Sequence, residues 1–149
     1  MNEDIEELLY REKLTLASIK KRATAFFIDE LLLSLLLIVV LWDSFAASTN
    51  IQDTIALTNT FLLEFIAIKI AYQTFFVMQY GGTLGKIFMH IRVIEIKSVA
   101  NPTILCSFNR ATFRVISEMM FYIGFFWGIM TPERRTWHDL SSKTLVVDV

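Results

Sequence analysis

The sequence predicts an all-α integral membrane protein with two transmembrane helices, a third apolar segment and a small cytoplasmic β element. Of the 149 residues, 54% are hydrophobic and 13 are Phe. Two apolar runs last about 20 residues or longer, the length that a helix needs to cross the ~30 Å hydrocarbon core of a bilayer. A soluble domain interrupts its apolar runs every few residues, so we interpret both runs as membrane spans.

Composition also limits the functions that the chain can have. The formal net charge of −1 leaves no basic surplus with which to bind nucleic acid. A single cysteine, Cys106, excludes an internal disulfide and a cysteine-based metal cluster. The two histidines, His90 and His138, form no paired-His motif. We therefore expect no nucleic-acid partner, no metal, no cofactor, no catalytic residue and no enzymatic activity.

The N-terminal tail, residues 1–21, is charged and has the leucine spacing of a short amphipathic helix. Leu8, Leu9 and Leu16 suit a helix that lies on the cytoplasmic surface of the membrane with its acidic side chains in water. We expect the tail to form a unit apart from the membrane domain.

Three apolar segments make up the membrane domain, residues 22–149, and their approximate limits are 22–42, 54–80 and 111–130. The first ends at Trp42, which suits the far membrane interface. The second begins near Thr54, a good helix N-cap, and ends at the glycine pair 81–82. Lys86, just after that pair, is expected at the interface near lipid phosphates.

The third segment allows two readings. Gly124 and Gly128 make a re-entrant bend possible, and their spacing also permits a helix–helix contact between two copies of the chain. The alternative is a third full crossing. Two runs rich in β-branched residues, 91–96 and 144–149, are typical of strands. If these strands pair, both must lie on one side of the membrane.

Orientation follows from the distribution of Lys and Arg, which tend to stay in the cytoplasm. The tail 1–22 has five of these residues, the connection 43–53 has none, and the loop 81–110 has four. The N-terminus is therefore predicted to be cytoplasmic. Arg134, Arg135 and Lys143 place the C-terminus there too, which favours the re-entrant reading. Three crossings with an external C-terminus remain the alternative.

Three short blocks occur in a fixed order: RATAFFID from residue 22, GGTLGKIFMHIRV from 81 and RRTWHDLSSKTLVV from 134. Together they resemble the signature of the RDD family of mainly bacterial membrane proteins, over about residues 20–148. That family is named for one Arg and two Asp. In this sequence the matching residues are Arg22, Asp29 and Asp139.

The sequence departs from the family pattern at SSKT, residues 141–144, and at Trp137. Neither departure touches the three named charges. The resemblance implies a membrane domain with a role in transport and leaves the transported species open.

Charged residues within the apolar segments form the candidate site. Arg22 and Asp29 are seven residues apart, on nearly one helix face and roughly 10 Å from each other. We expect Arg22 to form a bidentate pair with Asp139. Intramembrane charges cost about 2.5–3.5 kcal/mol each, so they should face inward and pair. Before Asp139 is added, the set that we expect to pair has four acids and four bases: Asp29, Glu30, Glu64, Glu118, Arg22, Lys69, Arg110 and Arg114.

These features favour a small bacterial inner-membrane protein that transports or senses a small ion or solute through one closed charge network. Asp29, with Glu30, is the candidate carboxylate for binding a proton or cation. Three segments are too few to enclose a pathway, so we expect a homo-oligomer in the lipid bilayer. The alternative is a non-catalytic assembly subunit whose charges lock the segments together.

Overall fold

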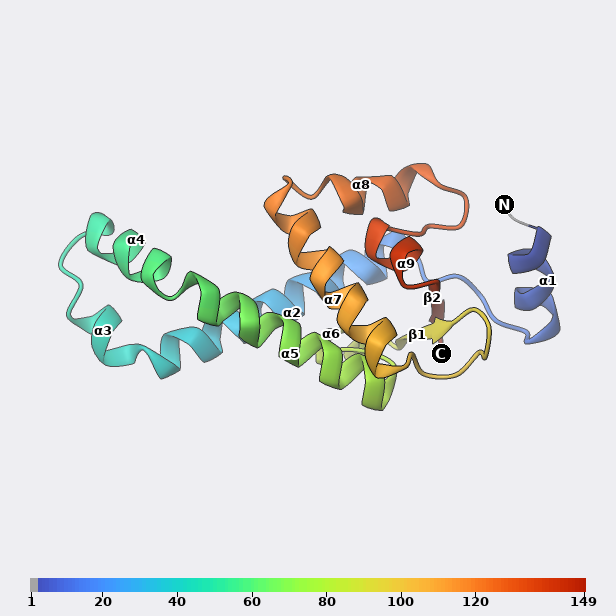
Figure 1. Ribbon diagram of the computed structural model, residues 1–149, viewed down its shortest axis with the longest axis horizontal. Helices are drawn as coiled ribbons and strands as arrows, with labels where there is room; N and C mark the ends of the chain where they lie inside the picture. The colour runs from blue at the N-terminus through green and yellow to red at the C-terminus, as the bar shows by residue number, and fades with distance from the viewer. Residues whose placement is uncertain (1–2) are drawn as a thin grey trace.

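The computed structural model describes residues 3–149 as a mostly helical chain with one small sheet (Figure 1). In chain order the elements are α1 (Glu3–Arg11), α2 (Ile19–Val40), α3 (Trp42–Ala46), α4 (Ile51–Thr60), α5 (Leu62–Tyr80), α6 (Leu84–Phe88), β1 (Ile91–Glu95), α7 (Ile104–Met119), α8 (Ile123–Met130), α9 (Trp137–Ser141) and β2 (Thr144–Asp148). The predicted fold class is confirmed.

Two helices, α2 and α5, have the length and apolar composition needed to cross a membrane. Figure 1 shows α2 and the α4–α5 arm running along the long axis, with α3 at one end and the sheet at the other. Large apolar side chains such as Leu35, Val39, Leu63 and Phe75 are exposed on these helices. An apolar outer face of this kind is stable against lipid, so the protein is a multi-pass membrane protein.

Side-chain caps set the helix starts. Ser18 Oγ accepts a hydrogen bond from the Lys21 amide at 3.2 Å, so the first span begins earlier than predicted. Asn50, rather than Thr54, caps the second arm, because its Oδ1 accepts from the Asp53 amide at 2.9 Å. The arm breaks between α4 and α5. Its predicted end at the glycine pair is confirmed, since Gly81 has a left-handed φ of 71°.

The third apolar segment is bent, but not at its glycines. Helices α7 and α8 meet at 104°, and the turn contains Phe121 and Tyr122 with φ of 52° and 62°. Gly124 and Gly128 are buried inside the chain. A Cβ on Gly128 would lie 2.8 Å from Thr136 Cγ2. The prediction that these glycines bend the segment or meet a second copy was wrong, because they pack against their own chain.

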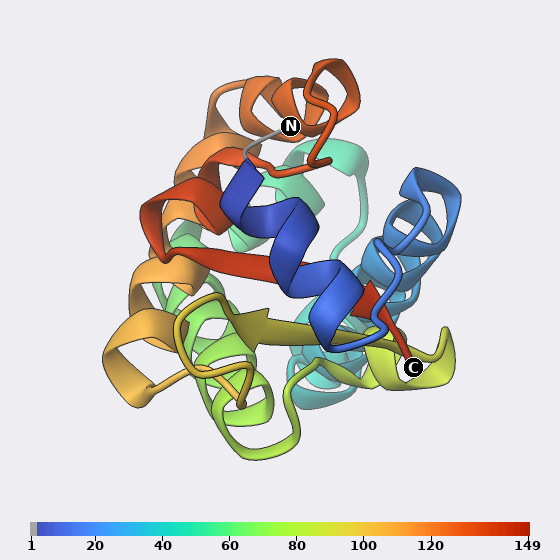
Figure 2. The same ribbon diagram turned by 90° about the vertical axis from the view of Figure 1, so that its right-hand side faces the viewer.

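The two predicted strands pair antiparallel, with Ile91 opposite Asp148 and Glu95 opposite Thr144. One face of the sheet packs on α2 and α5 through a buried cluster that includes Val93 and Val146. The other face is covered by α1, which lies across it in Figure 2.

The amphipathic helix predicted in the N-terminal tail is present as α1, but its apolar face packs against the sheet and is not free to lie on lipid. Ile5 and Leu8 of α1 are buried against the sheet. The Ala17 amide donates to the Val146 carbonyl at 3.0 Å, which fastens the tail to β2. Burial of apolar side chains against the sheet stabilises a small amphipathic helix. The sequence pattern shows that the helix has an apolar face but does not show which surface will cover that face.

Strand pairing favours the re-entrant reading of the third segment. Because β1 precedes α7 and β2 follows α9, the bent pair starts and finishes at the end of the molecule where the sheet lies. A segment that enters the membrane and returns would have its two ends placed in this way, and the bend between α7 and α8 is visible in Figure 1.

Candidate functional site

Asp139 is positioned by the first turn of α9. Thr136 and Asp139 form a capping box in which the Thr136 amide donates to Asp139 Oδ2 at 3.1 Å. The Thr136 hydroxyl donates to the same oxygen at 2.8 Å. The short sequence Thr-x-x-Asp thus places a carboxylate, 0% exposed, where α9 meets α7 and α2.

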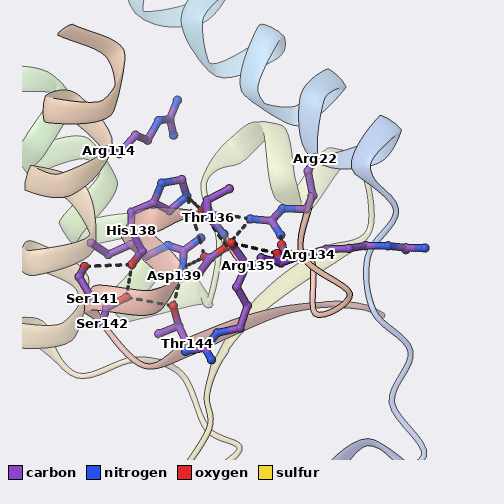
Figure 3. A network of polar contacts seen from close by, with 12 residues as sticks. Arg22, Arg114, Arg134, Arg135, Thr136, His138, Asp139, Ser141, Ser142 and Thr144 are labelled. Atoms are coloured by element: carbon purple, nitrogen blue, oxygen red, sulfur yellow. Dashed lines mark hydrogen bonds and ion pairs between the residues drawn. The ribbon is translucent and has the colours of Figure 1, made fainter. Parts of the chain in front are cut away.

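Two arginines from different helices contact this carboxylate, and Figure 3 shows one of them, Arg22, beside Asp139. Arg22 of α2 donates to Asp139 Oδ2, and Arg110 of α7 donates to Oδ1. The pairing of Arg22 with Asp139 expected from the sequence is present. It is not bidentate, because the other terminal nitrogen of Arg22 donates to the Arg134 carbonyl. We call Arg22, Arg110 and Asp139 the Asp139 cluster.

The electrostatics of this cluster keep Asp139 ionised. Burial alone would raise the pKa of Asp139, but Arg110 and Arg22 outweigh burial and hold that pKa well below its usual range. Burial lowers the pKa of the neighbouring His138 well below 6.5, and Arg110 adds to the effect. His138 is therefore neutral at physiological pH, and its Nε2 lies 2.8 Å from the Thr136 hydroxyl.

A second group of charges lies deeper between α2, α5 and α7. Lys69 of α5 contacts Glu30 at 2.9 Å and Glu118 at 2.5 Å. Arg114 of α7 contacts Glu118 at 3.1 Å, Glu30 at 3.4 Å and Asp29 at 3.9 Å. We call Asp29, Glu30, Lys69, Arg114 and Glu118 the Lys69 cluster. The spacing of Arg114 and Glu118 puts both on one face of α7.

Asp29 is the most enclosed acid of the Lys69 cluster. Its carboxylate accepts hydrogen bonds from Tyr72 Oη at 2.9 Å, Thr83 Oγ1 at 2.6 Å and the Gly85 amide at 2.9 Å. A Cβ on Gly85 would collide with the Ala25 carbonyl, so only glycine lets α6 approach α2 this closely. Three donors and a nearby guanidinium make Asp29 a junction of α2, α5 and α6.

The structure changes the membership of the predicted network. Glu64 is exposed on α5 and has no ion pair with any of residues 3–149, so its assignment to the network was wrong. Asp139 takes its place, and four acids still face four bases. The predicted single network is instead two clusters, since no ion pair within the described chain joins them. Figure 3 shows Arg114 apart from the residues around Asp139.

A cavity of about 340 Å³ lies between the two clusters. Arg22 and Arg110 line it from the Asp139 cluster, and Asp29 and Arg114 line it from the Lys69 cluster. Lys86 of α6 also lines it, whereas the sequence predicts this residue on the open surface at the membrane interface. Only 9% of Lys86 is exposed, because α6 folds back against α2. The glycine pair before α6 is the one sequence signal for such a turn.

The profile of the RDD family matches residues 16–143. The chain belongs to the RDD family. A search of curated proteins and a search of solved structures each found no match. The matched region contains both clusters of this RDD protein and the cavity. Its three family-naming charges are divided, since Arg22 and Asp139 pair while Asp29 belongs to the Lys69 cluster.

Proposed function

We propose that this RDD protein moves or senses a proton or another small cation through the Lys69 cluster. The observation that carries the proposal is the charge balance of the cluster. Within the described chain, its ion pairs join three carboxylates to two cationic side chains. Each carboxylate has a cationic partner, but the cluster as a whole carries one more negative than positive charge among helices that lie in the membrane.

A surplus charge in this environment is expensive. An ionised side chain at the bilayer centre costs about 2.5–3.5 kcal/mol even on the mildest scale, and a proton or cation removes that cost. Such a site therefore binds and releases a positive charge as its surroundings change. This property is what a transporter or a sensor of small cations requires.

Glu30 is the carboxylate best placed to accept that charge. Its side chain is 26% exposed, against 12% for Glu118 and 0% for Asp29. Both Glu30 and Asp29 were candidates on sequence grounds. The three donors around Asp29 favour a permanent acceptor there. We therefore assign the exchangeable proton or cation to Glu30 and a positioning role to Asp29.

The test is cation-driven proton flux in proteoliposomes. Glu30→Gln keeps the shape of the side chain and removes its charge, so flux should be lost at equal protein insertion. Glu64→Gln is the matched control, because Glu64 is an exposed acid outside the cluster and its removal should leave flux unchanged. Equal flux in wild type and Glu30→Gln would overturn the assignment.

Two segments and a bent pair do not enclose a pathway, so transport requires a homo-oligomer. Chromatography with light scattering in detergent measures this directly, and a stable monomer would contradict it. We place the protein in the bacterial inner membrane with its N-terminus in the cytoplasm. The excess of Lys and Arg at the sheet end supports this orientation. No catalytic role is proposed.

A second candidate function is a non-catalytic assembly subunit. The observation that favours it is the complete burial of Asp29 and Asp139, each held by donors from more than one segment. Buried ion pairs of this kind can fix the register of helices without moving any ion. Absence of flux in the wild type across Na⁺, K⁺ and Li⁺ gradients would favour this alternative.

A further inference from the structure

The cavity between the clusters is basic. Among the described residues that line it, Arg22, Lys86, Arg110, Arg114 and Arg134 are cationic, and Asp29 is the only acid. The balance is opposite to that of the Lys69 cluster. A cavity of this size matches those that bind small molecules.

Lys86 is the unpartnered charge of this cavity. It is nine-tenths buried, yet its ammonium has no hydrogen bond and no ion pair with any of residues 3–149. Burial of an ammonium without an anion is costly, so native proteins satisfy such groups. The side chain lines the cavity, and a ligand there would satisfy it.

Arg110 supplies a second unsatisfied donor group beside Lys86. It is 1% exposed, and its Nε and Nη2 have no partner within the described chain. These two nitrogens form one edge of the guanidinium, which is buried beneath the cavity surface and becomes available to an oxyanion when the side chain turns. Its remaining nitrogen, Nη1, is held by Asp139 and Thr144.

We propose that the cavity binds a phosphate-type oxyanion, with Lys86 as the main charge contact and Arg110 and Arg22 beside it. Guanidinium groups match the geometry of phosphate oxygens, and lysine provides the point charge. The inference does not depend on cation transport through the Lys69 cluster.

The rest of the wall indicates that the oxyanion belongs to a molecule with an apolar part. Phe26, Phe125, Phe126 and Ile129 line the cavity on the sides of α2 and α8. Phe126 is 61% exposed and Ile129 55%, so this wall continues onto the apolar outer surface. A phosphate at the end of a lipid fits this combination, and a soluble phosphate ester shares its charged group.

The protonation of Lys86 is coupled to the binding of an oxyanion in the cavity. Burial, followed by Arg110 and Arg114, lowers the pKa of Lys86 well below 10.5, while Asp29 and Asp139 oppose the shift. The neutral His138 of α9, Tyr122 of the turn before α8, and Tyr72 of α5, whose Oη accepts from the Leu84 amide, are further titratable groups around it. A bound oxyanion favours the ammonium and raises that pKa. Binding should therefore take up protons and should weaken as pH rises.

The experiment compares binding to wild type, Lys86→Met and Lys97→Met. Methionine preserves the length of the side chain without its charge, and Lys97 is an exposed lysine away from the cavity. Inorganic phosphate is titrated calorimetrically into protein in a zwitterionic detergent. Phosphatidylglycerol is tested by native mass spectrometry of protein from nanodiscs that contain it at a fixed fraction in phosphatidylcholine.

We expect Lys86→Met to lower the affinity for at least one probe about tenfold, while Lys97→Met leaves it unchanged. Retention of phosphatidylglycerol alone would assign the site to a lipid head group. Binding of inorganic phosphate in the calorimetric titration would assign the site to a soluble phosphate compound. Equal binding to Lys86→Met and wild type, or no binding of either probe, would overturn the proposal.

Folding of the variant is checked independently. Removal of an unpaired buried ammonium takes away an unfavourable group, so Lys86→Met should melt at or above the wild-type temperature. Glu30→Gln should bind both probes as wild type does. Failure of the anion site and failure of the cation proposal are thereby distinguished.

Discussion

The Lys69 cluster and the Asp139 cluster are both buried groups of ion pairs, yet their charge balances are opposite. The first joins three acids to two bases, and the second joins one acid to two bases. The acidic surplus lies between the membrane helices, and the basic surplus lies where α9 and the sheet close the other end. The two clusters together contain equal numbers of acidic and basic side chains, but each cluster alone does not. The acidic surplus predicts a cation as ligand, and the basic surplus predicts an anion.

Removal of the single acid of the Asp139 cluster should have the largest effect. Asp139→Asn leaves the buried Arg110 and the largely enclosed Arg22 without a counter-charge, and loss of one buried partner costs about 3–5 kcal/mol. Denaturant unfolding in detergent measures the change. Asp148→Asn is the matched control, since its pair with Lys21 is partly exposed and contributes about 0–1 kcal/mol. Equal loss in the two variants would contradict the distinction.

Low pH should weaken the Asp139 cluster without a mutation, because it protonates Asp139. The folded-state pKa of Asp139 is lowered below the unfolded value of about 3.9, so its contribution is fully present above that pH. It is lost as pH falls towards the lowered pKa. Melting temperatures from about pH 6 down to about pH 2.5 should decline more steeply for wild type than for Asp139→Asn. Parallel declines would show that other carboxylates dominate.

Within the Lys69 cluster, loss of a base should cost more than loss of an acid. Lys69→Met leaves three carboxylates facing Arg114 alone, and we expect a loss of about 1–3 kcal/mol in the free energy of unfolding. The same denaturant assay measures it. Addition of Glu118→Gln to Lys69→Met should recover part of the loss, because it removes one of the three acids that then share Arg114. Further loss in the double variant would contradict the acidic surplus.

The smallest effect is expected for Glu30→Gln. Its side chain is partly exposed and the variant brings the Lys69 cluster to equal numbers of acids and bases. Stability should change by no more than about 1 kcal/mol. The contrast with Asp139→Asn tests the comparison directly, since both variants remove one carboxylate. If Glu30→Gln lowered the free energy of unfolding as much as Asp139→Asn does, the proposed difference in charge balance between the two clusters would be wrong.

Several parts of the fold follow from local sequence. The two spans are visible as long apolar runs, and the strands are visible as β-branched runs beside turns. The glycine pair at 81–82 ends α5 because a left-handed residue stops a helix. Pairing of Arg22 with Asp139 could be expected because a buried arginine needs a carboxylate.

Other features depend on helix rotation, which no local pattern records. Glu64 and Lys69 are on one helix, but only Lys69 faces α7, and this choice is made by the packing of α5. The bend before α8 is made by Phe121 and Tyr122, although neither is a typical bend residue. Gly124 and Gly128 serve instead for close packing within the chain.

The sequence by itself determined that the chain enters the membrane, belongs among RDD-like proteins and carries charges that must pair. Hydrophobic length and the cost of isolated charge are local properties, so they can be read residue by residue. Tertiary structure decided which charges meet, that they form two clusters of opposite surplus, and that Lys86 lines a cavity between them. Those outcomes depend on distances between residues far apart in the chain, which only packing fixes.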